Sequence, residues 1–182
     1  MKALFCTLLI AFCVTMSMSQ TSSYGSFKLD NQEIIYQKVF TQDSITLSKL
    51  AEYYQTLPYI SDVSQSGDQV TFAFNDLVVD YKKFQFAQVA VPPIIQTGKY
   101  SGKAAVGIKD GKYRLTLRNL QMTGDIGYKK IPAKENLTNY SCENNGTSIA
   151  QNWCKPNTLG LLEKAFTDKL QYVAKSNGDG DW

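Results

Sequence analysis

The chain has 182 residues, of which 43% are hydrophobic and 19% charged, and its formal net charge of +3 is only mildly basic. This balance fits one folded domain and argues against a dedicated nucleic-acid-binding protein. The absence of histidine excludes serine–histidine and cysteine–histidine catalysis and every zinc site that needs a histidine ligand.

Residues 1–19 have the pattern of a secretory signal peptide. Lys2 supplies a positive charge, and the stretch 3–14 is apolar but too short to span a bilayer. We therefore expect cleavage near Ser19–Gln20 and a periplasmic or secreted mature protein without a transmembrane segment. Lipid attachment at Cys13 is an alternative that the bulky residue before this cysteine disfavours.

The rest of the chain divides into three parts. Residues 20–32 lack hydrophobic periodicity, so we expect a flexible N-terminal lead-in. Residues 33–174 carry the periodic segments of a single α+β domain. Residues 175–182 follow a helix-ending Ser-Asn-Gly sequence and are expected to form a disordered tail.

The domain begins with a strand and a helix. The segment 33–40 carries apolar residues on both sides, as in a strand covered on both faces or a strand near an edge with mixed burial. An apolar stripe at helical spacing predicts a helix over 41–57. Thr41 or Asp43 can cap its start, and Pro58 ends it.

Two further strands follow, joined by a turn. They are predicted at 59–65 and 69–74, with the turn at 66–68. The segment 75–90 is apolar without one period, and fits either a continued strand or a short helical piece. The stretch 91–95 contains two consecutive prolines, so we expect an extended connector that cannot be an interior strand.

The stretch Gly98–Met122 organises the fold. Two alternating runs flank Asp110–Gly111, a leading signal for a two-residue type I′ turn. Because side chains alternate between the faces of a sheet, the hairpin has an apolar face and a polar face. The apolar face carries Tyr100, Ala104, Val106, Ile108, Tyr113, Leu115 and Leu117. The polar face carries Lys99, Lys103, Lys109, Lys112, Arg114, Thr116 and Arg118.

The polar face of the hairpin is the candidate binding surface. The register places Lys103 directly opposite Arg118, a like-charge pair that costs roughly 0.2–1 kcal/mol. Carboxylates on an adjacent strand, or side chains splayed in solvent, would relieve this repulsion. A bound anion would do the same. The candidate ligand-binding residues are Lys99, Lys103, Arg114 and Arg118.

A long polar connection at 123–153 precedes the last helix, and such length within a domain is often functional or cross-linked. Cys142 and Cys154 are the two cysteines of the expected mature chain. In an exported protein they predict a disulfide that staples this loop and contributes roughly 3 kcal/mol. A metal site or a nucleophile pair is the alternative, but no histidine is present to complete either.

The same connection contains three sequons, at Asn136, Asn139 and Asn145. Their modification needs a eukaryotic-type secretory route. We interpret them as a consequence of an Asn-, Ser- and Thr-rich loop.

The last predicted helix follows Pro156 and can be capped by Asn157. Its apolar stripe consists of Leu159, Leu162, Phe166, Leu170 and Val173. No internal repeat, metal site or cofactor site is predicted.

The order strand, helix, four strands, helix, with the sequence from Lys109 to Arg114 and the upstream Gly98 and Gly102, resembles a bacterial exported family of unknown function. Members of that family have a TATA-binding-protein-like (TBP-like) fold. The resemblance covers roughly 33–174. It implies a curved antiparallel sheet with two helices on one face and implies no activity. DNA binding by analogy with the fold's namesake is not expected of an exported protein.

Three hypotheses for function follow. The favoured one is a non-enzymatic binding module of the cell envelope, whose basic sheet face holds an anionic glycan, a lipid head group or an acidic envelope protein. The second is a hydrolase acting on envelope polymers through two carboxylates in a deep cleft. The third is an assembly role in which 91–95 or a strand edge docks a partner.

Overall fold

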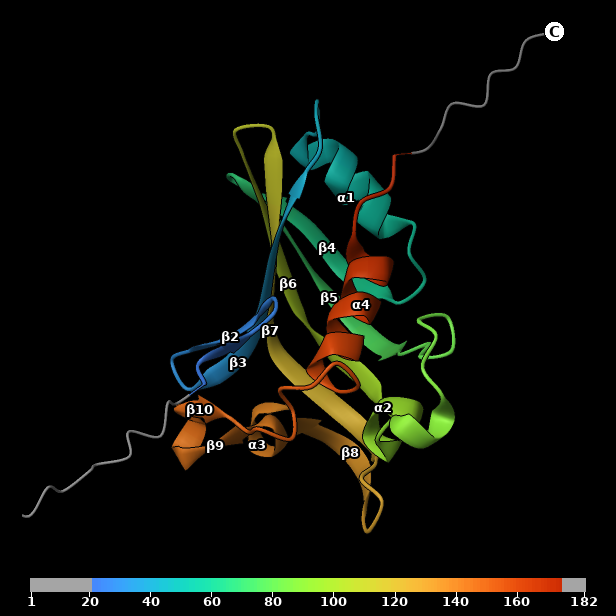
Figure 1. The fold of residues 1–182 in the computed structure, drawn as a ribbon. Coiled ribbons are helices and arrows are strands. Elements are labelled where there is room, and N and C mark those ends of the chain that lie inside the picture. Colours follow the sequence, from blue (N-terminus) through green and yellow to red (C-terminus); the bar gives the residue numbers. More distant parts are fainter. Residues whose placement is uncertain (1–20, 175–182) are drawn as a thin grey trace, which may run out of the picture.

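The structure is a computed structural model that describes residues 21–174, so the predicted signal peptide at 1–19 and the predicted tail at 175–182 lie outside the described residues. Its main element is an eight-stranded antiparallel sheet with the strand order β1-β2-β3-β7-β6-β5-β4, and β8 pairs with β7 beside this path (Figure 1). The strands are β1 Ser23–Tyr24, β2 Phe27–Asp30, β3 Glu33–Thr41, β4 Ile60–Ser66, β5 Gln69–Val78, β6 Lys99–Lys109, β7 Lys112–Asp125 and β8 Lys130–Asn136.

Two longer helices lie on the same side of this sheet (Figure 1). α1, Leu47–Gln55, packs on β4 and β5, and α4, Leu159–Leu170, lies beside it. The predicted α+β architecture, an antiparallel sheet with helices on one face, is therefore confirmed. The shorter elements are α2 Pro93–Thr97, α3 Thr138–Ser141, β9 Cys142–Glu143, β10 Ser148–Ile149 and 3-10 turns at Gln88–Ala90 and Asn144–Gly146.

Phe166 of α4 stands at the centre of the core. Its ring centroid lies 5.5 Å from that of Tyr36 on β3 and 5.8 Å from that of Phe74 on β5. Both pairs have the edge-to-face geometry that aromatic rings prefer, and all three side chains are inaccessible to solvent. These contacts fix α4 across the strands and leave the other face of the sheet free of it.

The central hairpin has the predicted register. Asp110 and Gly111 form the turn with φ angles of 51° and 69°, as a type I′ turn requires, and Lys103 lies opposite Arg118. The apolar face points into the core. Beyond Arg118, a bulge with Asn119 at a φ of 50° shifts the pairing. The hairpin thus sorts apolar groups toward the helices and cations toward the opposite face.

Tyrosine hydroxyls hold the C-terminal end of α4, where a helix has carbonyl groups without helical partners. The hydroxyls of Tyr53, Tyr54 and Tyr59 donate to the carbonyls of Gln171 (2.9 Å), Leu170 (2.8 Å) and Lys169 (2.6 Å), respectively. In addition, the Tyr113 hydroxyl accepts a hydrogen bond from the Tyr172 amide (2.8 Å). This tyrosine clamp joins α1, β7 and the loop before β4 to the end of α4.

The prediction of a flexible lead-in at 20–32 is wrong for the residues that the structure describes. β1 and β2 form a hairpin that extends the sheet beyond β3. Phe27 is fully buried, with its ring centroid 5.4 Å from that of Tyr36. Strands of two and four residues are too short to produce a recognisable alternation.

The first helix is shorter than the predicted 41–57. β3 continues to Thr41, which pairs with Lys112. The helix begins at Leu47, and the N-cap is Thr46, whose side chain accepts a hydrogen bond from the third amide of the helix. Strand pairing therefore takes Thr41, and the other predicted cap, Asp43, lies in a turn before the helix.

The stretch 91–95 is not the extended connector that its prolines suggested. Pro93 is the first residue of α2, a position where proline is tolerated because the amide there has no helical partner. Ile94 and Ile95 are buried, and the Tyr100 hydroxyl donates to the Ile94 carbonyl (3.0 Å). α2 is therefore part of the core.

Backbone pairing, rather than a disulfide, closes the connection at 123–153. Cys142 and Cys154 are both free thiols, so the predicted disulfide staple is not present. β8 pairs with β7, β9 pairs with β10, and the Ser141 carbonyl accepts a hydrogen bond from the Ala150 amide (2.8 Å). These bonds perform the role that the disulfide was expected to have.

Candidate functional site

A hollow of about 520 Å³ lies on the open face of the sheet, over β5, β6 and β7. Small side chains form its floor because Thr71, Ala105 and Thr116 are cross-strand neighbours on three adjacent strands. None of them is long enough to fill the space above the sheet. Longer charged side chains stand at the rim: Asp62, Lys103 and Arg118. The hollow therefore brings together two of the four predicted binding residues.

The hydroxyl of Thr116 is held by a short hydrogen-bond chain. Lys28 Nζ donates to Gln37 Oε1 (2.7 Å), and Gln37 Nε2 donates to Thr116 Oγ1 (3.0 Å). Because Thr116 Oγ1 accepts this bond, its own proton remains available to a group in the hollow.

Arg118 is neutralised by carboxylates on neighbouring strands. Its guanidinium forms ion pairs with Asp30 of β2 and with Glu33 of β3, the latter at 3.6 Å. Of the three predicted ways to relieve the repulsion between Lys103 and Arg118, carboxylates on adjacent strands are the one that the structure shows for Arg118. A further ion pair joins Lys134 to Asp76, with 3.9 Å between the nitrogen and the oxygen, which is longer than either pair of Arg118.

The other three predicted residues have no such partner. Among residues 21–174, no ion pair or side-chain hydrogen bond involves Lys99, Lys103 or Arg114, and all three are exposed. Arg114 borders a neighbouring hollow of about 440 Å³ toward the hairpin turn, whereas Lys99 lines neither hollow. We call Lys99, Lys103 and Arg114 the open-face cations.

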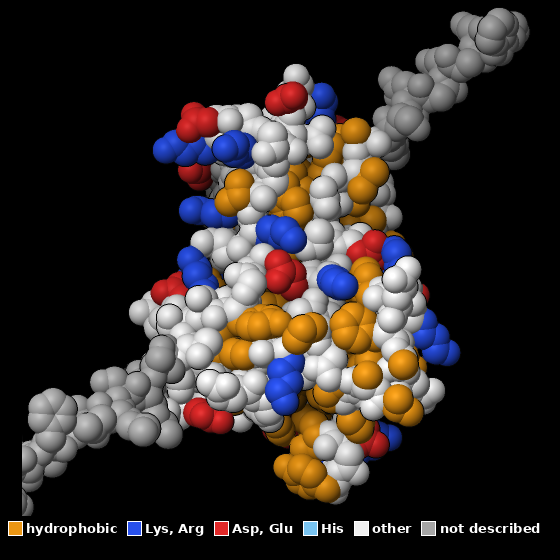
Figure 2. All heavy atoms as spheres, in the orientation of Figure 1, with side chains coloured by type: hydrophobic (Ala, Val, Ile, Leu, Met, Phe, Trp, Pro, Cys, Tyr) orange, Lys and Arg blue, Asp and Glu red, His pale blue; other side chains and the backbone are white. Residues whose placement is uncertain are grey.

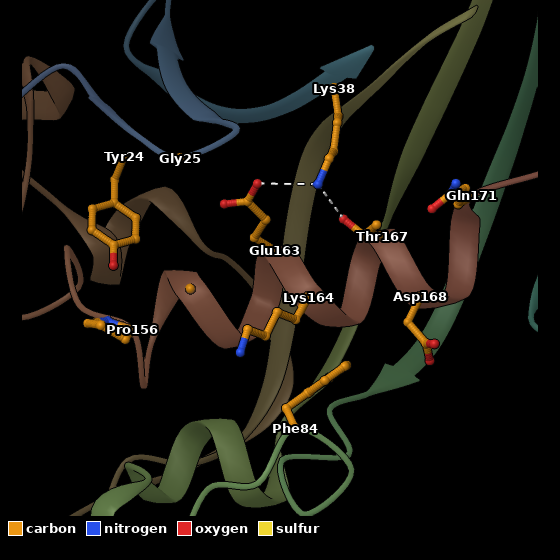
Figure 3. Close-up of a pocket in the computed structure, with 11 residues that line it drawn as sticks. Tyr24, Gly25, Lys38, Phe84, Pro156, Glu163, Lys164, Thr167, Asp168 and Gln171 are labelled. Atoms are coloured by element: carbon orange, nitrogen blue, oxygen red, sulfur yellow. Dashed lines mark hydrogen bonds and ion pairs between the residues drawn. The ribbon is translucent and has the colours of Figure 1, made fainter. Parts of the chain in front are cut away.

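A larger hollow, of about 620 Å³, lies on the opposite side of the molecule along α4 (Figure 3). Lys38 of β3 points toward the helix, and its ammonium group lies between Glu163 (3.5 Å) and Thr167 (3.0 Å). The Ser26 hydroxyl also donates to Glu163 (2.6 Å). The carboxylate thereby ties α4 to the N-terminal hairpin and to β3.

The remaining charged groups of this helix-side groove are also engaged. Asp168 forms an ion pair with Lys83 at 2.5 Å, and the Lys164 ammonium lies 5.3 Å from the ring centroid of Phe86. Size alone favours this groove as a binding site. Because its charges already bind one another, we interpret it as the joint between α4 and its surroundings.

Figure 2 shows the helix side of the molecule. Hydrophobic side chains gather in the lower half of the view, and lysines, arginines and acidic residues are interspersed across the upper half. Tyr128, in the turn between β7 and β8, is 90% exposed. This side carries charges of both signs close together, as its ion pairs require.

The two cysteines of the described residues are poor candidates for a nucleophile. Burial raises the pKa of the Cys142 and Cys154 thiols above their usual value, so both are protonated and weakly nucleophilic at neutral pH. Within residues 21–174, no cluster of three cysteine, aspartate or glutamate side chains could hold a metal ion. In the same range, no helix has the length and apolar character needed to cross a membrane.

Sequence reasoning identified the cations but not what surrounds them. It does not find Asp30 and Glu33 as partners of Arg118, because the sequence around Asp30 predicts a flexible segment. The floor of the hollow has a weak signal in the sequence, because Ala105 and Thr116 are short side chains on the polar face of the hairpin.

No protein-family model and no curated protein matches the chain. Two solved structures are similar to it. A DUF4468 family protein from Bacteroides ovatus aligns with a TM-score of 0.45 and 9% identity, over 83% of this chain and 94% of that one. A TBP-like protein from Parabacteroides distasonis aligns with a TM-score of 0.44 and 10% identity, over 80% of this chain and 97% of that one.

The second description carries the fold name that the resemblance of the hairpin sequence implied. The first names a family by number only. At these identities and TM-scores the similarity assigns no activity, ligand or partner to this chain.

Proposed function

We propose that the protein is an exported, non-enzymatic binding module that holds an anionic ligand on the open face of its sheet. One observation carries the proposal: the open-face cations Lys99, Lys103 and Arg114 are exposed and have no carboxylate partner among the described residues. The signal-peptide pattern of residues 1–19 supports export.

Their place on the open face distinguishes these cations, because other exposed lysines of the described residues, such as Lys49, Lys82 and Lys129, also have no carboxylate partner. Arg118, Lys134, Lys38 and Lys83 each have a carboxylate within ion-pair distance. A lysine or arginine that keeps its charge unpaired beside a hollow is available to a carboxylate or phosphate of a ligand. The hollow of about 520 Å³ beside Lys103 provides space for a part of such a ligand.

A charge-reversal experiment tests the assignment. The variant Lys99→Glu/Lys103→Glu/Arg114→Glu is compared with a control of identical net charge, Lys49→Glu/Lys82→Glu/Lys129→Glu. All three control lysines are exposed and lie outside the open face. The probes are polygalacturonate, polyglutamate and phosphatidylglycerol vesicles, measured at low salt because exposed charges are screened.

We expect the wild type to bind at least one of the three probes. The open-face variant should lose at least tenfold in affinity for that probe, because each charge-assisted contact is worth about 1.5–3 kcal/mol. The control variant should stay within about twofold of wild type. Equal losses in the two variants, or no binding of any probe by the wild type, would contradict the proposal.

A further inference from the structure

We infer that the ligand of the open face is a linear acidic polysaccharide that lies lengthwise along the β6–β7 hairpin. The inference rests on the proposed function and adds to it the shape and chemical class of the ligand. Its basis is the spacing of the open-face cations, the carboxylates that border them, and the hydroxyl-bearing floor between them.

The open-face cations form a row along the hairpin, and Lys112 and Lys109 continue it toward the turn. Lys99 and Lys103 are four residues apart on β6, and Arg114 pairs with Gly107, four residues beyond Lys103. A strand rises about 3.3 Å per residue, so neighbouring cations are about 13 Å apart and the row is about 26 Å long. A compact anion such as inorganic phosphate can touch one of them at a time, whereas an extended chain can touch all three.

Carboxylates border this row on both sides. Asp30 and Glu33 lie on β2 and β3, and Asp62 and Asp76 lie on β4 and β5. A broad anionic surface such as a lipid bilayer would also face these carboxylates, of which Asp62 forms no ion pair among residues 21–174, at a cost in repulsion. A narrow chain along the hairpin meets the cations and avoids the borders.

The floor of the row suits sugar hydroxyls. Thr71 and Thr116 present hydroxyl groups on either side of Ala105, and Thr116 retains a free proton to donate. All four aromatic side chains of β5, β6 and β7 are buried on the helix side: Phe72, Phe74, Tyr100 and Tyr113. The face thus has no aromatic platform on which the bases of a single-stranded nucleic acid could stack.

The floor is less suited to an acidic peptide. A peptide laid across the face of a sheet, rather than along its edge, cannot form ladder hydrogen bonds with it. Its backbone amides and carbonyls would lie over the methyl groups of Ala73 and Ala105 without partners, which is unfavourable for buried polar groups.

The test compares ligand lengths. Titration calorimetry measures the affinity of the wild-type protein for galacturonate, its trimer and its decamer at low salt, each expressed per uronate unit. The decamer should bind at least about tenfold more tightly per uronate than the monomer, because contacts after the first are intramolecular. Lys103→Glu, in the middle of the row, should remove most of this gain.

The outcomes separate the inference from the proposed function. If monomer and decamer bind equally per uronate and the triple open-face variant still loses binding, the lengthwise chain is wrong and the anion site remains. If polyglutamate or phosphatidylglycerol vesicles bind as tightly as the decamer, the polysaccharide class is wrong. If the triple variant binds the decamer like wild type, the inference and the proposed function both fail.

Discussion

The two sides of the sheet use charge in opposite ways. On the helix side, Lys38, Glu163 and Asp168 bind one another or their neighbours, and their contacts join α4 to β3, to the N-terminal hairpin and to the loop after β5. On the open side, Lys103 and Arg114 project without a partner among the described residues. The paired charges of the helix side therefore hold the fold, whereas the charges of Lys103 and Arg114, on the open face, are available to a ligand.

The largest contrast in stability should come from the core beneath the helix side. Phe166→Ala removes a fully buried ring that contacts two strands, so we expect it to lower the free energy of unfolding by about 3–5 kcal/mol. Lys103→Ala on the open face should change it by no more than about 0.5 kcal/mol. Urea denaturation measures both, and a comparable loss in the two variants would break the distinction between the sides.

A smaller loss of stability should follow from removing one carboxylate of the helix-side groove. Glu163→Ala leaves Ser26 and Lys38 without their carboxylate, so we expect a loss of about 1–3 kcal/mol in the free energy of unfolding. Binding of polygalacturonate should remain unchanged. Glu52→Ala, which removes an exposed carboxylate from α1, is the matched control and should be nearly neutral. Loss of binding in the Glu163 variant would assign a ligand to the groove instead.

The tyrosine clamp predicts sensitivity to alkali. Burial raises the pKa of Tyr59 and of Tyr113 from an ordinary value of 10.0 to about 12. Between pH 10 and about 12, the unfolded chain therefore loses phenolic protons that the folded chain retains, and stability falls as pH rises. Below pH 10 this contribution is fully present. Thermal unfolding across this range should show a falling melting temperature.

Replacing one tyrosine of the clamp tests whether that tyrosine contributes to the alkaline loss of stability. Tyr59→Phe leaves the Lys169 carbonyl without its hydrogen bond, at a cost of about 1 kcal/mol near neutral pH. Because the variant lacks one group with a raised pKa, its stability should fall less steeply above pH 10. An unchanged slope would mean that Tyr59 does not contribute to the alkaline transition.

The part of the fold predicted from sequence depends on local signals. The Asp110–Gly111 turn and the alternation around it specify the hairpin register, the buried face and the positions of Lys103 and Arg114. Those features need only neighbouring residues in the chain, and the structure reproduces them.

The features that were missed depend on distant contacts. Asp30 and Arg118 are 88 residues apart in the chain, and their pairing exists only because a short N-terminal hairpin joins the sheet beside β3. Nothing near Arg118 in the sequence indicates it. Likewise, the floor of the hollow becomes visible only when β5, β6 and β7 are placed side by side, which aligns Thr71, Ala105 and Thr116.

An NMR titration of isotope-labelled protein with the galacturonate decamer tests the central claim most directly, because it reports both sides of the sheet in one experiment. We predict that chemical-shift changes concentrate at residues 99–107 and 114–118 of the hairpin and leave residues 160–171 of the helix-side groove unmoved. Changes concentrated along 160–171, with the hairpin silent, would contradict the assignment of the ligand to the open face.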